Sequence, residues 1–279
     1  MDLDALIDLV GDGGVVALTG AGLSTESGIP DYRGPSGLAR RATPMTLQTF
    51  TGTLAARRRY WARSSLGWRT IARAQPNAGH RAVAALQDAG LLAGIVTQNV
   101  DGLHQAAGAR DVLELHGSLD RVICLECRQL TNREELDRRL LAANRGWTAQ
   151  ASAINPDGDV ELSEEAVSSF RVVDCLRCGG VLKPDVVFFG ENVPRDRVDR
   201  TFALVESAGC LLVLGSSLTV MSGYRFVLRA AKLGVPVAIV NEGVTRGDPQ
   251  AALKVDARLG DVLPGLVARL ARGELLQQH

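Results

Sequence analysis

Apolar and polar residues along this chain form two recurring patterns, one typical of helices and one typical of buried strands. Leu3, Leu6, Ile7 and Val10 recur at the i, i+3, i+4, i+7 spacing of an amphipathic helix. Residues 15–19 instead form a short, continuous apolar run, which is typical of a strand covered on both faces of a parallel sheet. This segment therefore predicts a helix followed by a buried strand.

The two patterns alternate along much of the chain. Further strands are expected at residues 92–97, 112–115, 211–215 and 235–241, and further helices at residues 77–89, 198–205 and 263–270. Helices that alternate with buried strands cover both faces of a parallel sheet. The sequence thus predicts an α/β fold with a doubly wound, parallel, Rossmann-like sheet.

Two stretches interrupt the alternation and predict a smaller second lobe. Residues 40–75 are helical in pattern and rich in arginine, and residues 126–181 hold a polar interior between cysteine pairs. Ligands bind parallel sheets at the carboxyl ends of the strands, where a second lobe would form the other wall of a cleft. The expected division is a large lobe of about 1–35, 77–120 and 184–275, and a small lobe of about 36–76 (helical) and 121–183 (cysteine-bearing).

Four of the five cysteines occur as two closely spaced pairs, Cys124 with Cys127 and Cys175 with Cys178. Two such turns supply four thiolates in the tetrahedral arrangement that zinc prefers, whereas two unrelated pairs are the alternative interpretation. Because four thiolates close the coordination shell, we expect one structural Zn²⁺ with no position for a substrate. Cys210 lies in an apolar run and is expected to be a small buried side chain.

A glycine-rich segment, residues 20–33, directly follows the first predicted strand. Glycines at such a strand end allow backbone N–H groups to approach a pyrophosphate, so the segment predicts nucleotide binding. Its third glycine, Gly28, is displaced from the usual dinucleotide fingerprint, and Pro30 cannot continue a helix. A hydride-transferring dehydrogenase is therefore disfavoured.

The charge and hydropathy of the chain exclude several partners. Lysine plus arginine equals aspartate plus glutamate, at 31 residues each, so no overall charge attracts nucleic acid or an anionic membrane. No apolar run approaches the roughly 18 residues of a membrane span. The first residues, Met-Asp-Leu-Asp, resemble neither a secretory leader nor a transit peptide. We therefore expect a cytoplasmic protein that binds neither nucleic acid nor membranes.

Polar residues follow four of the predicted strands at their carboxyl ends. They occupy residues 97–104, 116–118, 215–217 and 241–243. Each segment alone is more typical of a turn or a helix cap than of a site. Since the carboxyl ends of parallel strands meet at one edge of the sheet, four such segments beside the glycine-rich loop predict a common site there.

In these features the chain resembles the sirtuins, the NAD-dependent protein lysine deacylases. The resemblance follows the family's order over nearly the whole chain and is carried by residues 20–33, 97–104, 115–117, both cysteine pairs, 183–191, 215–217 and 241–242. A finer resemblance to the class II, mitochondrial-type branch rests on residues 59–63, 156–160 and 223–226. The lack of a transit-like leader favours a prokaryotic member of that branch.

The resemblance implies a single catalytic domain over residues 1–279, with NAD consumed as co-substrate. It implies phosphate contacts from Gly20, Ala21 and Gly22, and a covering loop that holds Thr25, Asp31, Tyr32 and Arg33. It implies nicotinamide-side contacts from Gln98, Asn99 and Asp101, and adenosine-side contacts from Gly215, Ser216, Ser217, Asn241 and Glu242. Leu259 stands near the adenine where relatives often carry a cysteine, so only a backbone contact would be retained there.

Among the four histidines, His116 is the expected general base. It ends a short predicted strand before a glycine, although its position alone leaves a structural role equally open. The resemblance implies that it acts with Asn99 and Asp101 and takes a proton from a ribose hydroxyl, which suits an imidazole with a pKa near neutrality. His80 is expected to be an ordinary surface or packing residue, and His104 a structural one.

The resemblance also implies acyl-lysine peptides or proteins as substrates. Their backbone would pair with the segment Val187, Phe188, Phe189, Gly190 and Glu191. Tyr60 and Arg63 share a face if they lie on a helix, where they could bind the carboxylate of an acidic acyl group. A solvated arginine face is the alternative, since residues 57–59 are also arginines. We hypothesise a preference for non-acetyl groups of the glutaryl or lipoyl type.

Two other functions stay open at this point. Mono-ADP-ribosyl transfer shares NAD binding and nicotinamide release, but it leaves ADP-ribose on the acceptor protein. A non-catalytic NAD-sensing or zinc-bearing module would have little need for a general base such as His116. The sequence therefore favours NAD-dependent deacylation, with protein mono-ADP-ribosyl transfer as the alternative.

Overall fold

The computed structural model describes residues 3–31, 44–149, 160 and 162–277. Its larger lobe is built on a six-stranded sheet of β1 (Val15–Thr19), β2 (Leu92–Thr97), β3 (Leu113–Glu114), β7 (Cys210–Leu214), β8 (Val237–Val240) and β9 (Leu253–Val255). All neighbouring strands are parallel, in the order β3-β2-β1-β7-β8-β9. This order, in which the chain builds outward in both directions from β1 and β7, confirms the predicted doubly wound fold.

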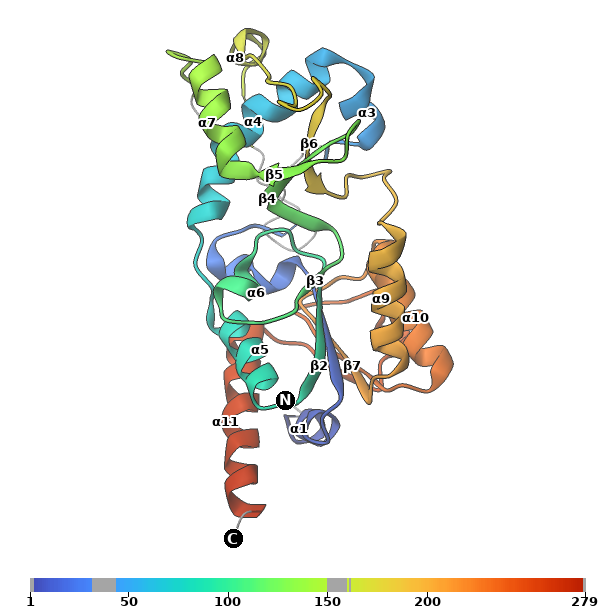
Figure 1. Cartoon of the computed structure of the whole chain (residues 1–279). Coiled ribbons are helices and arrows are strands. Elements are labelled where there is room, and N and C mark those ends of the chain that lie inside the picture. The colour runs from blue at the N-terminus through green and yellow to red at the C-terminus, as the bar shows by residue number, and fades with distance from the viewer. Residues whose placement is uncertain (1–2, 32–43, 150–159, 161, 278–279) are drawn as a thin grey trace.

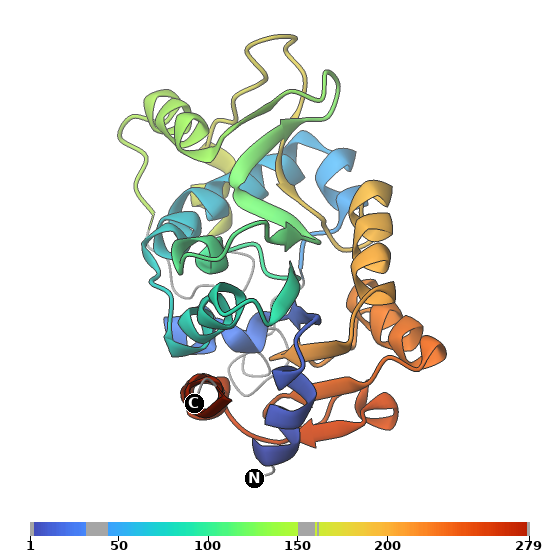
Figure 2. The same ribbon diagram turned by 60° about the horizontal axis from the view of Figure 1, so that its bottom comes forward.

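Alternate residues of each central strand face two separate cores. Five helices cover the sheet: α1 (Leu3–Gly11), α5 (Ala78–Asp88), α9 (Arg195–Glu206), α10 (Met221–Leu233) and α11 (Leu259–Gln277). Val15 and Ala17 pack with α1, α5 and α11, whereas Val16 and Leu18 pack with α9 and α10 on the opposite face (Figure 1, Figure 2). Burial on both faces explains why these strands are continuous apolar runs.

The smaller lobe contains an antiparallel sheet that the sequence pattern did not predict. Its strands are β4 (Gly117–Cys124), β5 (Leu130–Asn132) and β6 (Leu182–Val186), in the order β5-β4-β6. Helices α3 (Leu47–Gly52), α4 (Leu54–Arg73), α7 (Arg133–Ala143) and α8 (Glu164–Ser169) pack around it (Figure 1). β6 was not predicted because Lys183, Pro184 and Asp185 interrupt its apolar pattern.

Short elements connect these parts at the strand ends. They are two 3₁₀ turns after β1, η1 (Ala21–Leu23) and η2 (Thr25–Ser27), the short helix α6 (Leu103–Ala106) after β2, and the turn η3 (Asp248–Gln250) before β9. The strands expected at residues 15–19 and 92–97 coincide with β1 and β2, whereas the last helix is longer than the expected 263–270. The lobe boundaries expected from the sequence stay predictions.

An aromatic cluster fills the core of the smaller lobe. The ring of Tyr60 on α4 lies 5.4 Å from Phe50 and 5.2 Å from both Trp61 and Phe188. The contacts with Phe50 and Trp61 are edge-to-face and the contact with Phe188 is tilted, and aromatic pairs at these distances add to the energy of burial. The cluster fixes Tyr60 and Phe188 where the smaller lobe meets the carboxyl ends of the parallel strands.

Candidate active site

Two glycine-containing loops meet where the strand order reverses, between β1 and β7. The Gly20 N–H donates to Leu214 O (2.9 Å) and the Gly22 N–H donates to Gly215 O (2.8 Å). A Cβ atom on Gly20 would lie 2.7 Å from Ser216 Cβ, and one on Gly22 would lie 2.9 Å from Gly215 O. Close packing between the loops therefore requires both glycines, and their amides already have protein acceptors.

A cavity of about 440 Å³ opens at these strand ends and brings together most of the site residues predicted from the sequence. Those that line it are Gly20, Ala21, Gly22, Asp31, Tyr60, Gln98, Asn99, Asp101, His116, Val187, Phe188, Phe189, Gly190, Glu191, Gly215, Ser216, Ser217, Asn241 and Glu242. They come from both lobes, so the pocket has the two walls that the sequence predicted.

A few predicted site residues do not line this cavity: Thr25, Arg63 and Leu259. Arg63 lies on α4, and its Nε donates to Val160 O (2.6 Å). The Leu259 side chain is buried beneath the second glycine loop, where a Cβ atom on Gly215 would lie 2.8 Å from it. Two further predicted residues, Tyr32 and Arg33, lie outside the described residues.

Gln98 and Asn99 follow β2 and are held by the two glycine loops. The Gln98 side-chain amide donates to Ser216 Oγ (2.9 Å), and that of Asn99 donates to Gly20 O (3.0 Å). These bonds fix the two side chains in the pocket without any ligand. The carboxyl ends of β1, β2 and β7 thus form one connected surface.

Ser24 is a residue of this site that the sequence analysis did not identify. Its Oγ donates to Asp101 Oδ2 (2.7 Å) and accepts from Asn99 Nδ2 (3.1 Å). The Leu103 N–H donates to the other Asp101 oxygen (2.9 Å), while burial raises the pKa of this carboxyl. Ser24 therefore connects the first loop to the acidic group in the pocket. No sequence signal distinguished it from the other hydroxyl residues of its loop.

Two buried histidines lie behind the pocket. His80, expected to be an ordinary surface or packing residue, has its Nε2 3.4 Å from Ser24 Oγ, and its Nδ1 accepts from the Asn77 N–H (3.4 Å). His104 Nε2 lies 2.9 Å from Thr19 Oγ1, and the two imidazole rings are 5.3 Å apart. Burial lowers the pKa of His80 to about 4 and that of His104 to about 3, so both are neutral at pH 7.

His116 lies in the pocket with a hydrogen-bond partner for each ring nitrogen. Its Nδ1 lies 2.9 Å from Gln98 O, and its Nε2 lies 2.9 Å from Ser222 Oγ. Because a carbonyl only accepts, Nδ1 carries the proton of the neutral ring and Nε2 is the basic atom. Burial lowers the pKa of His116 to about 4, below the near-neutral value expected from the sequence; the Gln98 bond opposes this shift, and Arg197 and Arg225 add to it.

The segment 187–191 is anchored on both sides. The Val187 N–H donates to His116 O (2.8 Å), which ties the segment to the residue that carries the imidazole. At its other end, Glu191 pairs with the buried Lys183 Nζ (3.0 Å). Phe189 remains 38% exposed, so this side chain is accessible in the pocket wall.

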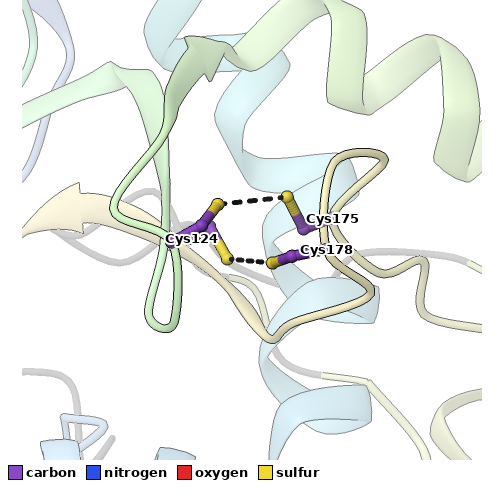
Figure 3. Close-up of side chains that lie close together, drawn as sticks. Cys124, Cys175 and Cys178 are labelled. Atoms are coloured by element: carbon purple, nitrogen blue, oxygen red, sulfur yellow. Dashed lines mark hydrogen bonds between the residues drawn. The ribbon is translucent and has the colours of Figure 1, made fainter.

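The four paired cysteines converge at one place in the smaller lobe. Their Sγ atoms all lie within 4.8 Å of one another, with Cys124 and Cys178 3.5 Å apart and Cys127 and Cys175 3.8 Å apart (Figure 3). A tetrahedron with Zn–S bonds of about 2.3 Å has sulfur–sulfur edges of about 3.8 Å. The donor set and its dimensions therefore fit a structural zinc ion. Cys210 is buried in β7, as expected.

A doubly wound sheet, a pocket at its switch point and a four-cysteine lobe together define a nucleotide-binding α/β protein with a structural metal site. The chain matches the Sir2 family over residues 20–222. It therefore belongs to that family, the sirtuins, as the sequence motifs predicted.

Individual relatives agree with this assignment. The chain is 62% identical over 269 residues to NAD-dependent protein deacetylase 1 of Streptomyces coelicolor, a match that covers 96% of this chain and 90% of the relative. It is 53% identical to NAD-dependent protein deacetylase 1 of Mycobacterium avium, covering 92% of each. A solved Sir2–p53 peptide–NAD⁺ structure superposes with a TM-score of 0.78 at 30% identity, covering 96% of this chain and 98% of the other.

We expect metal analysis to find one zinc ion per chain. Cys175→Ala should abolish stoichiometric zinc and lower the thermal unfolding midpoint by at least about 5 °C, because binding to four thiolates contributes directly to folding. Cys210→Ala is the matched control, since Cys210 lies in the sheet and should leave the zinc content unchanged. Full zinc content in the Cys175 variant would contradict the four-cysteine site.

The buried histidines make stability depend on pH. A histidine whose pKa is lowered on folding binds its proton more tightly in the unfolded chain, so stability falls as the pH drops from about 6.5 towards the folded-state pKa. For His80 and His104, whose folded-state pKa values are about 4 and about 3, this window lies below pH 6.5.

Urea unfolding between pH 7 and pH 4 measures this effect. We expect the free energy of unfolding to decrease on acidification, and His104→Gln, whose amide can still donate to Thr19, to show a shallower decrease. Acid also releases zinc, but it does so in both proteins, so the difference between their free energies of unfolding reports on His104 alone. An identical pH dependence in both proteins would contradict the burial of a neutral His104.

Proposed function

We propose that this protein is an NAD-dependent protein-lysine deacylase that transfers the acyl group to ADP-ribose and releases nicotinamide. The observation that carries the proposal is that Asn99, Asp101 and His116 line one pocket together with the two glycine loops. Family membership and the names of the relatives, which are NAD-dependent protein deacetylases, support the same chemistry.

The proposed NAD contacts follow the strand ends. The first glycine loop and its covering residues would hold the phosphates, and residues 98–101 would hold the nicotinamide end. The second glycine loop, with Asn241 and Glu242, would hold the adenosine end. Since the amides of Gly20 and Gly22 donate to protein carbonyls, a phosphate contact is expected from the Ala21 amide.

His116 is the proposed general base. When bound, NAD supplies a ribose carbon from which nicotinamide departs and which the acyl oxygen attacks. His116 Nε2 then accepts the proton of a ribose hydroxyl, for which the neutral tautomer fixed by Gln98 is suited. Its low pKa keeps Nε2 unprotonated at neutral pH. Closed four-thiolate coordination would give zinc a structural role only.

The proposed peptide contacts lie along residues 187–191 and the segment after Ser217, both of which line the pocket. Extended peptides bind by adding backbone hydrogen bonds to such segments, with modest sequence specificity. The name of the solved Sir2–p53 peptide–NAD⁺ neighbour supports a peptide substrate for this site. Acyl-lysine peptides or proteins are therefore the proposed substrates.

A preference for non-acetyl acyl groups is part of the proposal. Its support is the apolar part of the pocket lining, which includes Met45, Tyr60, Leu119 and Phe188 and suits a group longer than acetyl. Arg63 lies one turn along α4 from Tyr60. A lipoyl-type chain would need only the apolar lining, whereas a glutaryl-type group would also need the Arg63 guanidinium.

Membership of the class II branch is also proposed. It rests on the motifs at residues 59–63 and 223–226, while residues 156–159 lie outside the described part of the chain. The bacterial relatives agree with a prokaryotic origin. Among the described residues, no helix is long and apolar enough to cross a membrane. The cytoplasmic location stays a prediction.

Mass spectrometry of acyl-lysine peptides, incubated with the purified protein with and without NAD, tests the proposed reaction. The peptides carry acetyl, succinyl, glutaryl, methylglutaryl or lipoyl groups. We expect NAD-dependent loss of the acyl group, lowered at least about 100-fold by His116→Tyr, because a general base contributes that order of rate. NAD cleavage that adds ADP-ribose to a protein, without loss of any acyl group, would favour the alternative activity.

The acyl preference is tested with Arg63→Met. If Arg63 binds an acidic acyl group, this change should lower kcat/KM for glutaryl-lysine about tenfold or more and leave acetyl-lysine within about twofold, since one charge-assisted bond is lost. Arg57→Met on the same helix is the matched control. An unchanged kcat/KM for glutaryl-lysine in the Arg63 variant, relative to the unsubstituted protein, would contradict an acidic acyl pocket.

A further inference from the structure

Ser222 touches the base on the side opposite to Gln98. It lies in the first turn of α10, lines the pocket, and has its Oγ 2.9 Å from His116 Nε2. The Nδ1–H group donates to the Gln98 carbonyl, so the lone pair of the neutral ring is on Nε2. The Ser222 hydroxyl therefore donates to the atom that must receive the substrate proton.

The neighbouring glycine makes this contact sterically accessible. A Cβ atom on Gly223 would lie 2.4 Å from Gln98 Oε1, so a side chain there would have to displace the Gln98 carboxamide from its bond to Ser216. With Gly223 in place, Gln98 and Ser222 approach the same imidazole ring from two elements. The hydroxyl contact is thus part of the packing that forms the pocket.

The charges around the ring favour the unprotonated base. Arg225 on α10 and Arg197 on α9 both disfavour an imidazolium. Arg197 is itself paired with Asp185 of β6 (3.3 Å). Asp101 and Glu191 also line the pocket, and no side chain apart from Ser222 is hydrogen-bonded to Nε2 in the described part of the chain. A proton reaches Nε2 most directly through Ser222.

We propose that Ser222 is a further catalytic residue that relays the proton from the substrate hydroxyl to His116. The ribose O–H bond breaks as its proton moves to Ser222 Oγ, and the Ser222 hydroxyl proton moves to Nε2 in the same step. The serine is regenerated, the imidazole becomes cationic, and the ribose oxygen gains the electron pair for its attack. This inference rests on the proposed function, because it requires His116 to act as a base.

Ser222→Ala removes the relay and leaves the ring bonded to Gln98. We expect the single-turnover rate of acyl transfer to fall about tenfold to a hundredfold, the range for losing an efficient proton transfer. Exchange of labelled nicotinamide into NAD should stay within about twofold, because nicotinamide departs before a proton is removed. Ser222→Thr, which keeps a hydroxyl, should restore most of the rate.

A proton inventory in mixtures of H₂O and D₂O provides a readout that a structural role would not change. Two protons move together in the relay, so a plot of the acyl-transfer rate against the deuterium fraction of the solvent should be curved. In Ser222→Ala a straight line is expected if one proton moves directly to Nε2. Ser207→Ala on the exposed end of α9 is the matched control and should behave as the unsubstituted protein.

The outcomes separate the relay from the proposed function. If the unsubstituted protein removes acyl groups with NAD, but Ser222→Ala keeps its rate or loses acyl transfer and nicotinamide exchange equally, the relay is overturned. If the unsubstituted protein removes no acyl group, the proposed function fails first. A selective loss of acyl transfer, restored by Ser222→Thr, supports the relay.

Discussion

The close contact between two backbone loops at the centre of the sheet is the constraint on which the pocket depends. Gly20 and Gly22 pack against Gly215 and Ser216 with no room for a Cβ atom, and two N–H···O bonds join the loops. Gln98 binds Ser216, and Asn99 binds Gly20 O. Gln98 and Asn99 are therefore positioned by the same contact that joins the two loops at the switch point of the sheet.

The loop contact is linked to the His116 imidazole through Gln98, which binds Ser216 with its side chain and His116 with its carbonyl. The Gln98 carbonyl selects the tautomer of His116, and Ser24 binds Asp101, which lines the same pocket. Behind them, His80 and His104 are buried and neutral, and their hydrogen bonds to Ser24 and Thr19 support the first loop. Their burial lowers the free energy of unfolding in acid, because each of these rings would be protonated in the unfolded chain.

The smaller lobe supports its own wall of the pocket by different means. An aromatic core, the four cysteines and a buried cation–π cluster, in which Arg133 lies 5.3 Å from the Trp61 ring and 4.7 Å from the Trp68 ring, hold its short elements together. The Lys183–Glu191 pair connects this lobe to the segment 187–191. A small lobe with short strands gains stability from a bound metal ion, which agrees with a closed structural site.

The sequence by itself determined the sheet, the zinc ligands and most of the pocket. Buried parallel strands are readable as continuous apolar runs, and paired cysteines have the spacing of zinc ligands, whereas the pocket residues at the strand ends were identified through the resemblance to the sirtuins. The antiparallel sheet was not predicted, because Lys183, Pro184 and Asp185 hide the apolar pattern of β6. Only the tertiary structure revealed the contacts of Ser24, His80 and Ser222, since each is hydrogen-bonded to a partner distant in sequence. A lone serine or histidine has no local pattern, and its chemistry is set by the groups that folding brings within hydrogen-bond distance.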